Sequence, residues 1–319
     1  MRELKFGVFL PFYGFGHEGP QIQQHFSRIQ DIVLECERLG YHSLWLDDHL
    51  MFKNSSIFEC WTTLSALSSK TRTIRLGTMA TCNSFRHPAL LAKMVATIDN
   101  ISKGRLELGI GSGIQQAEHV SYGLPLPQPS DRTSKLNESV EILKKMWTQE
   151  KTSYAGKHYQ LYEAFCEPKP VQKPHPPITI AGCGEKLTLK VTALHADRFD
   201  WGYLPSIEQY KHKLSVLQKY CKTIGRDYRE IEKSCWPGGQ VFIASQIREL
   251  DEKLSQRKPL RMSISDFAKT NLVGTPEQCR RSIQQYVDLG VTFFMLFFGD
   301  LPSTDGLKLF AETIIKPLN

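Results

Sequence analysis

The feature that most constrains the fold of this chain is a regular alternation of short apolar runs with longer amphipathic runs, almost from end to end. Apolar runs of about four to eight residues are typical of buried strands, and apolar residues three and four positions apart are typical of helices. Eight strands are predicted, at residues 5–10, 43–46, 74–78, 105–110, 178–181, 198–201, 240–244 and 292–297. A helix is predicted after each strand, at residues 21–39, 60–69, 88–101, 132–148, 186–195, 207–224, 276–289 and 304–315. Eight successive βα units favour closure into an α/β fold of the (β/α)8 TIM-barrel type.

The chain of 319 residues is long for one domain, but α/β barrels of this length bury a single shared core. We therefore expect one domain over residues 1–319. Two stretches do not fit a minimal barrel: residues 151–177 are rich in proline and aromatic side chains, and residues 247–271 are basic. We expect both to be insertions on the barrel rim, with the second covering the active site.

Composition disfavours several other classes of protein. No apolar run approaches the roughly 20 residues of a membrane helix, and the first ten residues resemble a strand rather than a cleavable signal, so a cytoplasmic protein is expected. The net charge of +7 favours anionic ligands, but no basic block is interleaved with aromatic residues as a nucleic-acid surface requires. The eight cysteines are scattered, without a Cys-x-x-Cys pair, which indicates reduced thiols and no metal site.

Polar residues follow the second predicted strand. Catalytic groups of a (β/α)8 barrel gather at such positions, because the loops after many strands meet at one mouth. Asp47, Asp48 and His49 occupy this place. A histidine beside carboxylates is suited to proton exchange near neutral pH, since an unperturbed imidazole has a pKa of about 6.5. Spacing alone does not separate this role from that of a loop histidine bonded to solvent.

Glycines at positions 109, 111 and 113 follow the fourth predicted strand. They are not a dinucleotide fingerprint, because Ile114 stands where the third glycine of G-x-G-x-x-G would fall, and prolines follow instead of a helix. Two interpretations stay open: the glycines let a flat ring lie against the backbone, or they serve packing alone.

A second glycine-rich segment joins the fifth predicted strand to a helix. It consists of Gly182, Cys183, Gly184 and Glu185. Backbone amides at a helix N-terminus bind phosphate, because they are unpaired and lie at the positive end of the helix dipole. The alternative is an ordinary short turn between a strand and a helix.

Several segments of the chain resemble one known group of enzymes. They are residues 76–93 (LGTMATCNSFRHPALLAK), 101–113 (ISKGRLELGIGSG), 117–123 (AEHVSYG) and 176–190 (PPITIAGCGEKLTLK). These segments resemble the luciferase-like oxidoreductases that use coenzyme F420, a deazaflavin. Relatives that use FMN share the barrel and parts of these motifs, so the resemblance is more specific for the superfamily than for the cofactor.

The resemblance implies roles for individual residues. Asp48 and His49 match the position where family members place an acid/base histidine facing the cofactor, so His49 is the expected catalytic residue. Met79 and Ala80 match a non-proline cis peptide that bulges against the ring in deazaflavin-dependent relatives. Thr81 and Asn83 would face the ring, and the turn after the fifth strand would face the phosphate. The residues expected to contact the cofactor are Asp48, Met79, Ala80, Thr81, Asn83, Gly111, Ser112, Gly182, Cys183, Gly184 and Glu185.

One departure from the family pattern bears on the substrate. F420-dependent sugar-phosphate dehydrogenases carry a catalytic glutamate just after the glycines of the fourth strand, where this chain has Ile114. The resemblance therefore implies reversible hydride transfer between coenzyme F420 and another small organic substrate, with His49 exchanging a proton. The alternatives are an FMN-dependent monooxygenase and a flavin-binding barrel without catalytic activity. Relatives commonly form homodimers, which is the expected assembly.

Overall fold

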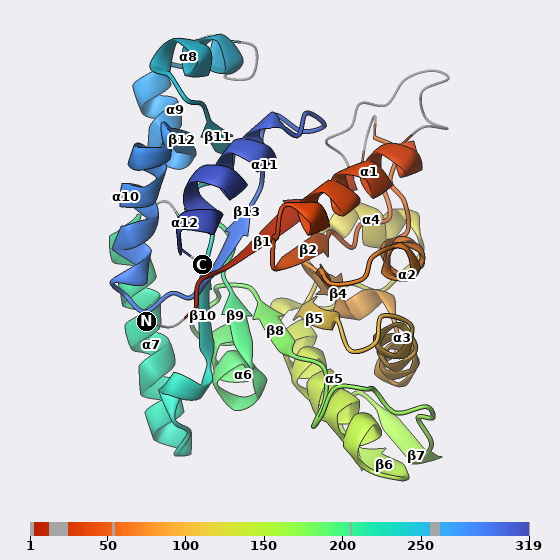
Figure 1. Ribbon diagram of the computed structural model, residues 1–319. Helices are drawn as coiled ribbons and strands as arrows, with labels where there is room; N and C mark the ends of the chain where they lie inside the picture. The colour runs from red at the N-terminus through yellow and green to blue at the C-terminus, as the bar shows by residue number, and fades with distance from the viewer. Residues whose placement is uncertain (1–2, 13–24, 53–54, 205, 256–261, 319) are drawn as a thin grey trace.

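The computed structural model describes residues 3–12, 25–52, 55–204, 206–255 and 262–318. Within these ranges eight parallel strands form a closed ring at the centre of the molecule (Figure 1). The ring closes because β3 pairs with β5 and β1 pairs with β13. The predicted (β/α)8 barrel is confirmed. In ring order the strands are β1 (Lys5–Leu10), β2 (Ser43–Leu46), β3 (Arg75–Thr78), β5 (Leu106–Gly111), β8 (Ile178–Ala181), β9 (Arg198–Asp200), β10 (Glu232–Cys235) and β13 (Phe293–Leu296).

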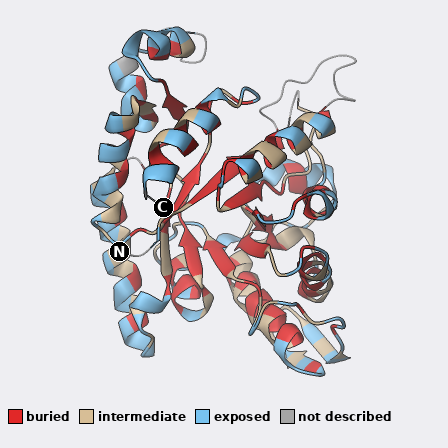
Figure 2. Ribbon diagram, viewed as in Figure 1, coloured by how far each residue is buried: buried red, intermediate tan, exposed pale blue. Residues whose placement is uncertain are grey.

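Helices surround the ring, with their buried sides toward the strands and their exposed sides outward (Figure 2). Some boundaries have a clear local cause: the Ser206 side chain caps the N-terminus of α7, and Gly225 ends that helix in the left-handed conformation. Residues 21–24 of the first expected helix lie outside the described residues. The surrounding helices are α1 (His25–Arg38), α2 (Cys60–Lys70), α3 (Pro88–Ile101), α5 (Pro129–Thr148), α6 (Thr188–His195), α7 (Ile207–Ile224), α10 (Pro276–Val287), α11 (Asp305–Phe310) with a π-helical continuation (Ala311–Ile315), and α12 (Lys316–Leu318).

The seventh barrel strand is not the one predicted from the sequence. The prediction placed it at residues 240–244, but β10 occupies that place in the ring. The sequence of β10 begins with two charged residues, and the first of them, Glu232, forms ion pairs with Lys5 on β1 and with Arg198 on the adjacent β9. The run at 240–244 forms β11 (Val241–Ile243), which pairs with β12 (Leu272–Gly274) in a separate two-stranded sheet. Its residues are as buried as those of a barrel strand, which explains the misassignment.

A network of charged side chains closes the amino-terminal end of the barrel. Glu107 on β5 forms ion pairs with Arg75 on β3 and with Arg198 on β9. The guanidinium of Arg198 also lies 3.9 Å from the ring centre of Phe293 inside the barrel. Burial alone raises the pKa of Glu107, but the two arginines outweigh it and lower that pKa to about 2. We call Arg75, Glu107, Arg198 and Glu232 the base network.

The two insertions lie in different places. Residues 151–177 contain a hairpin of β6 (Thr152–Ala155) and β7 (Gln160–Ala164), and Glu138 of α5 accepts backbone hydrogen bonds from residues 157–159. Residues 247–271 include α8 (Ile247–Ser255) and α9 (Ile264–Thr270), which bury their own apolar cluster against β11; residues 256–261 lie outside the described residues. In the described part of the chain, no helix has the length and apolarity to cross a bilayer.

Candidate functional site

A cavity of about 470 Å3 lies at the carboxyl ends of β2, β5 and β8, the end of the barrel opposite the base network. It also borders β4 (Thr81–Cys82), a short strand beside β5, and α4 (Gln116–Ser121). We call it the mouth cavity. Its lining includes Asp48, His49, Ala80, Thr81, Cys82, Phe85, Gly111, Ser112, Gly113, Ile114, Glu118, His119, Gly182, Cys183 and Gly184.

Most of the residues predicted to contact the cofactor line this cavity, but Met79, Asn83 and Glu185 do not. Met79 packs against an apolar cluster inside the barrel that includes Phe9. Asn83 is buried, and its Oδ1 has no hydrogen-bond partner among the described residues. Glu185 forms an ion pair with Lys213 and lines an adjoining cavity instead. The peptide bond between Met79 and Ala80 is cis, as the resemblance predicts.

Asp48 holds two segments of the cavity wall together. Its two carboxylate oxygens accept hydrogen bonds from Nη1 and Nη2 of Arg86, at 2.6 and 2.9 Å, and Oδ2 also accepts the backbone N–H of Cys82 at 2.9 Å. Arg86 in turn donates to Glu59, which caps α2. The carboxylate of Asp48 is thus committed to the protein, and the residue fixes β4 beside the loop that carries His49.

His49 forms a pair with a carboxylate that is distant in the sequence. Its Nδ1 lies 2.9 Å from Oε2 of Glu118, and its ring centre lies 4.5 Å from that of Phe52. The side chain of His49 is 26% exposed, whereas that of Glu118 is 4% exposed. Among the described residues Nε2 of His49 has no hydrogen-bond partner, so this nitrogen is available to a molecule in the cavity.

A second histidine, to which the sequence analysis gave no role, lies on another wall. His119 directs Nδ1 at the Gln115 carbonyl oxygen, 2.8 Å away, and Nε2 at Oγ of Ser84, 2.7 Å away. A carbonyl only accepts, so Nδ1 carries the proton and Nε2 accepts from the serine hydroxyl. Ser84 also lies 3.2 Å from the Cys82 thiol. Both nitrogens of His119 are therefore occupied, and it acts as a support for the wall.

The turn from β8 to α6 supplies a wall without bulky side chains. Gly182 has φ +116°, a conformation that glycine adopts far more readily than other residues, and donates its N–H to the Asp200 carbonyl oxygen. A Cβ atom on Gly184 would lie 3.1 Å from Oγ1 of Thr188. Nζ of Lys213 donates to the Cys183 carbonyl oxygen at 2.8 Å and fixes the turn from outside.

A second cavity of about 570 Å3 adjoins the first and shares Ser112, Cys183, Gly184 and Thr188 with it. Its charged lining residues are Arg132, Lys186, Lys213 and the carboxylate of Glu185, which forms an ion pair with Lys213 at 3.1 Å. Nε of Arg132 is buried and has no hydrogen-bond partner among the described residues. The N-termini of α5 and α6 also reach this cavity, and neither has a side-chain cap. These positive groups make the second cavity suited to an anion.

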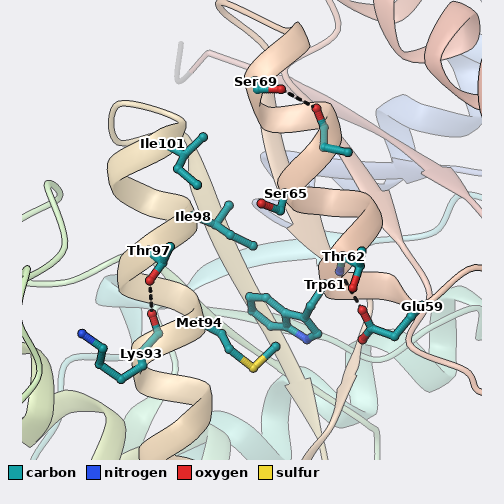
Figure 3. Close-up of a pocket in the computed structure, with 11 residues that line it drawn as sticks. Glu59, Trp61, Thr62, Ser65, Ser69, Lys93, Met94, Thr97, Ile98 and Ile101 are labelled. Atoms are coloured by element: carbon teal, nitrogen blue, oxygen red, sulfur yellow. Dashed lines mark hydrogen bonds between the residues drawn. The ribbon is translucent and has the colours of Figure 1, made fainter.

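A larger hollow, of about 780 Å3, is a groove between α2 and α3 on the outside of the barrel (Figure 3). It is lined mainly by short polar and apolar side chains, such as Ser65, Thr97 and Ile98. Its titratable side chains are Glu59 and Lys93. The groove contains no residue predicted for the site, and we assign it no chemistry.

Sequence analysis did not identify the pairing of Glu118 with His49, and it missed Arg86, Arg132 and Lys213. Glu118, Arg86 and Lys213 act through contacts with residues far away in the chain; Glu118, for example, lies 69 positions from His49. No local pattern marks such a carboxylate. Within the described ranges, no three His, Cys, Asp or Glu side chains come together as a metal site requires.

The fold and the site define the class of the protein: it is a (β/α)8-barrel enzyme with its site at the carboxyl ends of the strands. The model of the luciferase-like monooxygenase family matches residues 4–268, and the chain belongs to this family.

Individual proteins share both sequence and fold with the chain. An F420-dependent glucose-6-phosphate dehydrogenase from Microbacterium testaceum (strain StLB037) is 28% identical over 336 positions, covering 95% of this chain and 97% of that protein. The structure of a monooxygenase from Streptomyces bottropensis has a TM-score of 0.81 at 24% identity, covering 99% of this chain and 100% of that chain. The structure of an F420-dependent secondary alcohol dehydrogenase in complex with an F420-acetone adduct has a TM-score of 0.80 at 19% identity, covering 99% of both.

Proposed function

We propose that this enzyme binds coenzyme F420 in the mouth cavity and transfers a hydride between it and a small organic substrate, with His49 exchanging the accompanying proton. The observation that carries this proposal is the convergence of His49, Ala80, Gly111 and Gly182, from four separate strand ends, on one cavity. The relative named as an F420-dependent dehydrogenase supports the choice of cofactor.

The cavities have the size and chemistry that such a coenzyme requires. A volume of about 470 Å3 suits a flat ring system, and glycines at 111, 113, 182 and 184 leave parts of the wall bare. The adjoining cavity offers Arg132 and Lys186 to the anionic part of the molecule, whereas Lys213 is already bonded to Cys183 and Glu185. When bound, the deazaflavin supplies a carbon centre that accepts or gives a hydride and reacts poorly with oxygen.

The residues of the chain would then divide the work. Ala80, Gly111 and Ser112, which line the mouth cavity, would border the ring, and the turn at 182–184 with the adjoining cations would hold the phosphate. Nε2 of His49 is the available group that takes or returns a proton. The carboxylate of Asp48 is already paired with Arg86. We therefore expect Asp48 to hold the cavity wall in place rather than to contact the coenzyme through its charge.

The substrate is expected to lack a phosphate group. Ile114, at the position of the glutamate of the sugar-phosphate enzymes, lines the mouth cavity and is 76% exposed. No lysine or arginine is among the described residues that line this cavity, so a sugar phosphate would find no cationic partner there. We infer that the substrate differs from that of the glucose-6-phosphate dehydrogenase relative.

An FMN-dependent monooxygenase is the second candidate, and the structural similarity to a monooxygenase favours it. FMN also carries a phosphate that the turn at 182–184 would accommodate. We further propose that residues 1–319 form one domain. We also propose that the enzyme is a homodimer, and a measurement of its molecular mass in solution would check the dimer.

Parallel titrations of the purified protein with F420 and FMN, followed by absorbance, test the cofactor assignment. We expect the dissociation constant to be at least about tenfold lower for F420 than for FMN. A preference for FMN, with oxygen consumption after reduction, would transfer the assignment to the monooxygenase.

A further inference from the structure

The carboxylate of Glu118 is surrounded by hydrogen-bond donors from the loop after β2. Its Oε1 accepts the backbone N–H groups of Leu50 at 2.6 Å and Met51 at 3.2 Å, while Oε2 faces Nδ1 of His49 at 2.9 Å. The residue is only 3% exposed. A buried carboxylate with this many donors is fully satisfied in its ionised form.

These contacts determine which ring nitrogen of His49 carries the proton. An ionised carboxylate only accepts hydrogen bonds, so the nitrogen that faces it must donate. In the neutral ring, Nδ1 therefore holds the hydrogen and Nε2 presents a lone pair. Since His49 lines the mouth cavity and Nε2 has no partner among the described residues, this lone pair is available there.

We propose that Glu118 is a positioning residue that holds the imidazole of His49 in the tautomer whose Nε2 accepts a proton from the substrate. The catalytic part of this inference rests on the proposed function. In substrate oxidation the substrate would lose a hydride to the coenzyme and a hydroxyl proton to Nε2. The imidazolium formed would keep its Nδ1–H bond to Glu118, whose negative charge stabilises it.

A purely structural role for Glu118 would be to fasten the loop at residues 49–51. A second hydrogen bond holds the same loop: the hydroxyl of Tyr122, directly after α4, donates to the Leu50 carbonyl oxygen at 3.1 Å. Tyr122 has no hydrogen bond to His49. The variant Tyr122→Phe therefore loosens the loop without changing what faces the imidazole, and it serves as a matched control.

Glu118→Gln separates the two roles, because an amide has one accepting oxygen where the carboxylate has two. The two N–H groups of Leu50 and Met51 require that oxygen on their side. The amide NH2 then faces Nδ1 of His49, which must accept rather than donate. The proton of the neutral ring moves to Nε2, and the lone pair in the cavity is lost.

The first experiment measures 15N chemical shifts of histidine-labelled protein without coenzyme at pH 8, where an ordinary imidazole is neutral. Comparison with a His49→Asn variant assigns the His49 signals. We expect a protonated Nδ1 and a bare Nε2 in the wild type and in Tyr122→Phe, and the reverse in Glu118→Gln. Thermal melting shows that each variant is folded. The same tautomer in the wild type and in Glu118→Gln would overturn the proposal.

The second experiment uses F420-loaded enzyme and the alcohol, aldehyde, imine or enone that the wild type converts. Glu118→Gln is expected to lower kcat by about 10²–10⁴ with little change in KM, while Tyr122→Phe stays within about twofold of the wild type. An equal loss in both variants would indicate a structural role alone. If the wild type does not bind F420, the proposed function fails while the tautomer result still decides the role of Glu118.

Discussion

His49 shows how single residues at the site are held. One ring nitrogen is bonded to Glu118 and the other is available to the cavity, so the ring is oriented without being blocked. His119 differs, because both of its nitrogens are bonded within the wall. Two histidines of one cavity thus have different capacities for proton exchange, and the difference follows from their partners.

Replacement of His49 by alanine tests its catalytic role. The variant should bind F420 within a few-fold of the wild type, because the ring is one of many groups in the cavity wall. Turnover should fall by roughly 10²–10⁴, the usual contribution of general acid–base catalysis. Steady-state rates at saturating coenzyme check this, and partial recovery by added imidazole would support a proton-transfer role. Wild-type turnover from pH 5 to 8 would contradict it.

At this scale the sequence revealed the residues that follow directly on a strand, such as His49 and the glycines. The reason is geometric. The carboxyl ends of all barrel strands meet at the mouth, so a residue that directly follows a strand in the sequence lies at the mouth in the structure. Glu118 and Arg86 do not follow from this rule. Their roles depend on contacts across 69 and 38 positions, which only the folded chain reveals.

Two elements, the turn at 182–184 and α6, form the boundary between the two cavities. The turn contributes to both linings, and the helix begins there without a side-chain cap. The positive end of the helix dipole favours negative charge at this point, while the N–H groups of Leu189 and Lys190 already donate to backbone carbonyl oxygens. The nearby N-terminus of α5 adds a second positive helix end.

Gly184→Asp should lower coenzyme affinity by about tenfold or more, because it adds negative charge where the phosphate is expected. Gly184→Ala is the matched control, since it adds only a methyl group near Thr188. A titration with F420 of both variants separates charge from bulk. Equal losses in the two variants would attribute the effect to space, and unchanged binding in a folded Gly184→Asp would leave the turn a structural one.

At the level of elements, the sequence predicted seven barrel strands correctly but missed β10. Apolar runs identify strands that are buried on both faces, whereas β10 carries Glu232, whose charge is neutralised by partners on other strands. The same rule mistook β11 for a barrel strand, because its three residues are fully buried in a different sheet. Charge pairing between strands is a tertiary property that periodicity does not report.

In the whole molecule, the two ends of the barrel have separate tasks. The base network lies at the amino-terminal end and buries charges that neutralise one another. The mouth cavity lies at the opposite end, where side chains keep groups available for a ligand. A substitution at the base should therefore alter stability with little effect on coenzyme affinity.

Glu107→Gln should lower the free energy of unfolding at pH 7 by about 3–5 kcal/mol, because it leaves the buried Arg198 and the half-buried Arg75 without their shared carboxylate. The pKa of Glu107 is about 2, below its ordinary value. Its ionised form therefore stabilises the fold above about pH 4.5, and this stabilisation is lost as the pH falls toward 2. The difference between variant and wild type should shrink over that interval.

Denaturant unfolding at pH 7 and at pH 3 measures this difference. The control is Glu277→Gln, which breaks an exposed pair with Arg281 on α10 and should leave the midpoint almost unchanged. A Glu107→Gln variant as stable as the wild type at pH 7 would show that the base network is not needed for stability.

The distribution of sulfur in the molecule has a practical consequence. Seven of the eight cysteines are buried, whereas Cys183 is a partly exposed residue that lines both cavities. An alkylating reagent applied to the folded enzyme would thus label the ligand site in preference to any other place. Protection of this one thiol reports occupancy of the site, so ligands can be screened before any substrate is known.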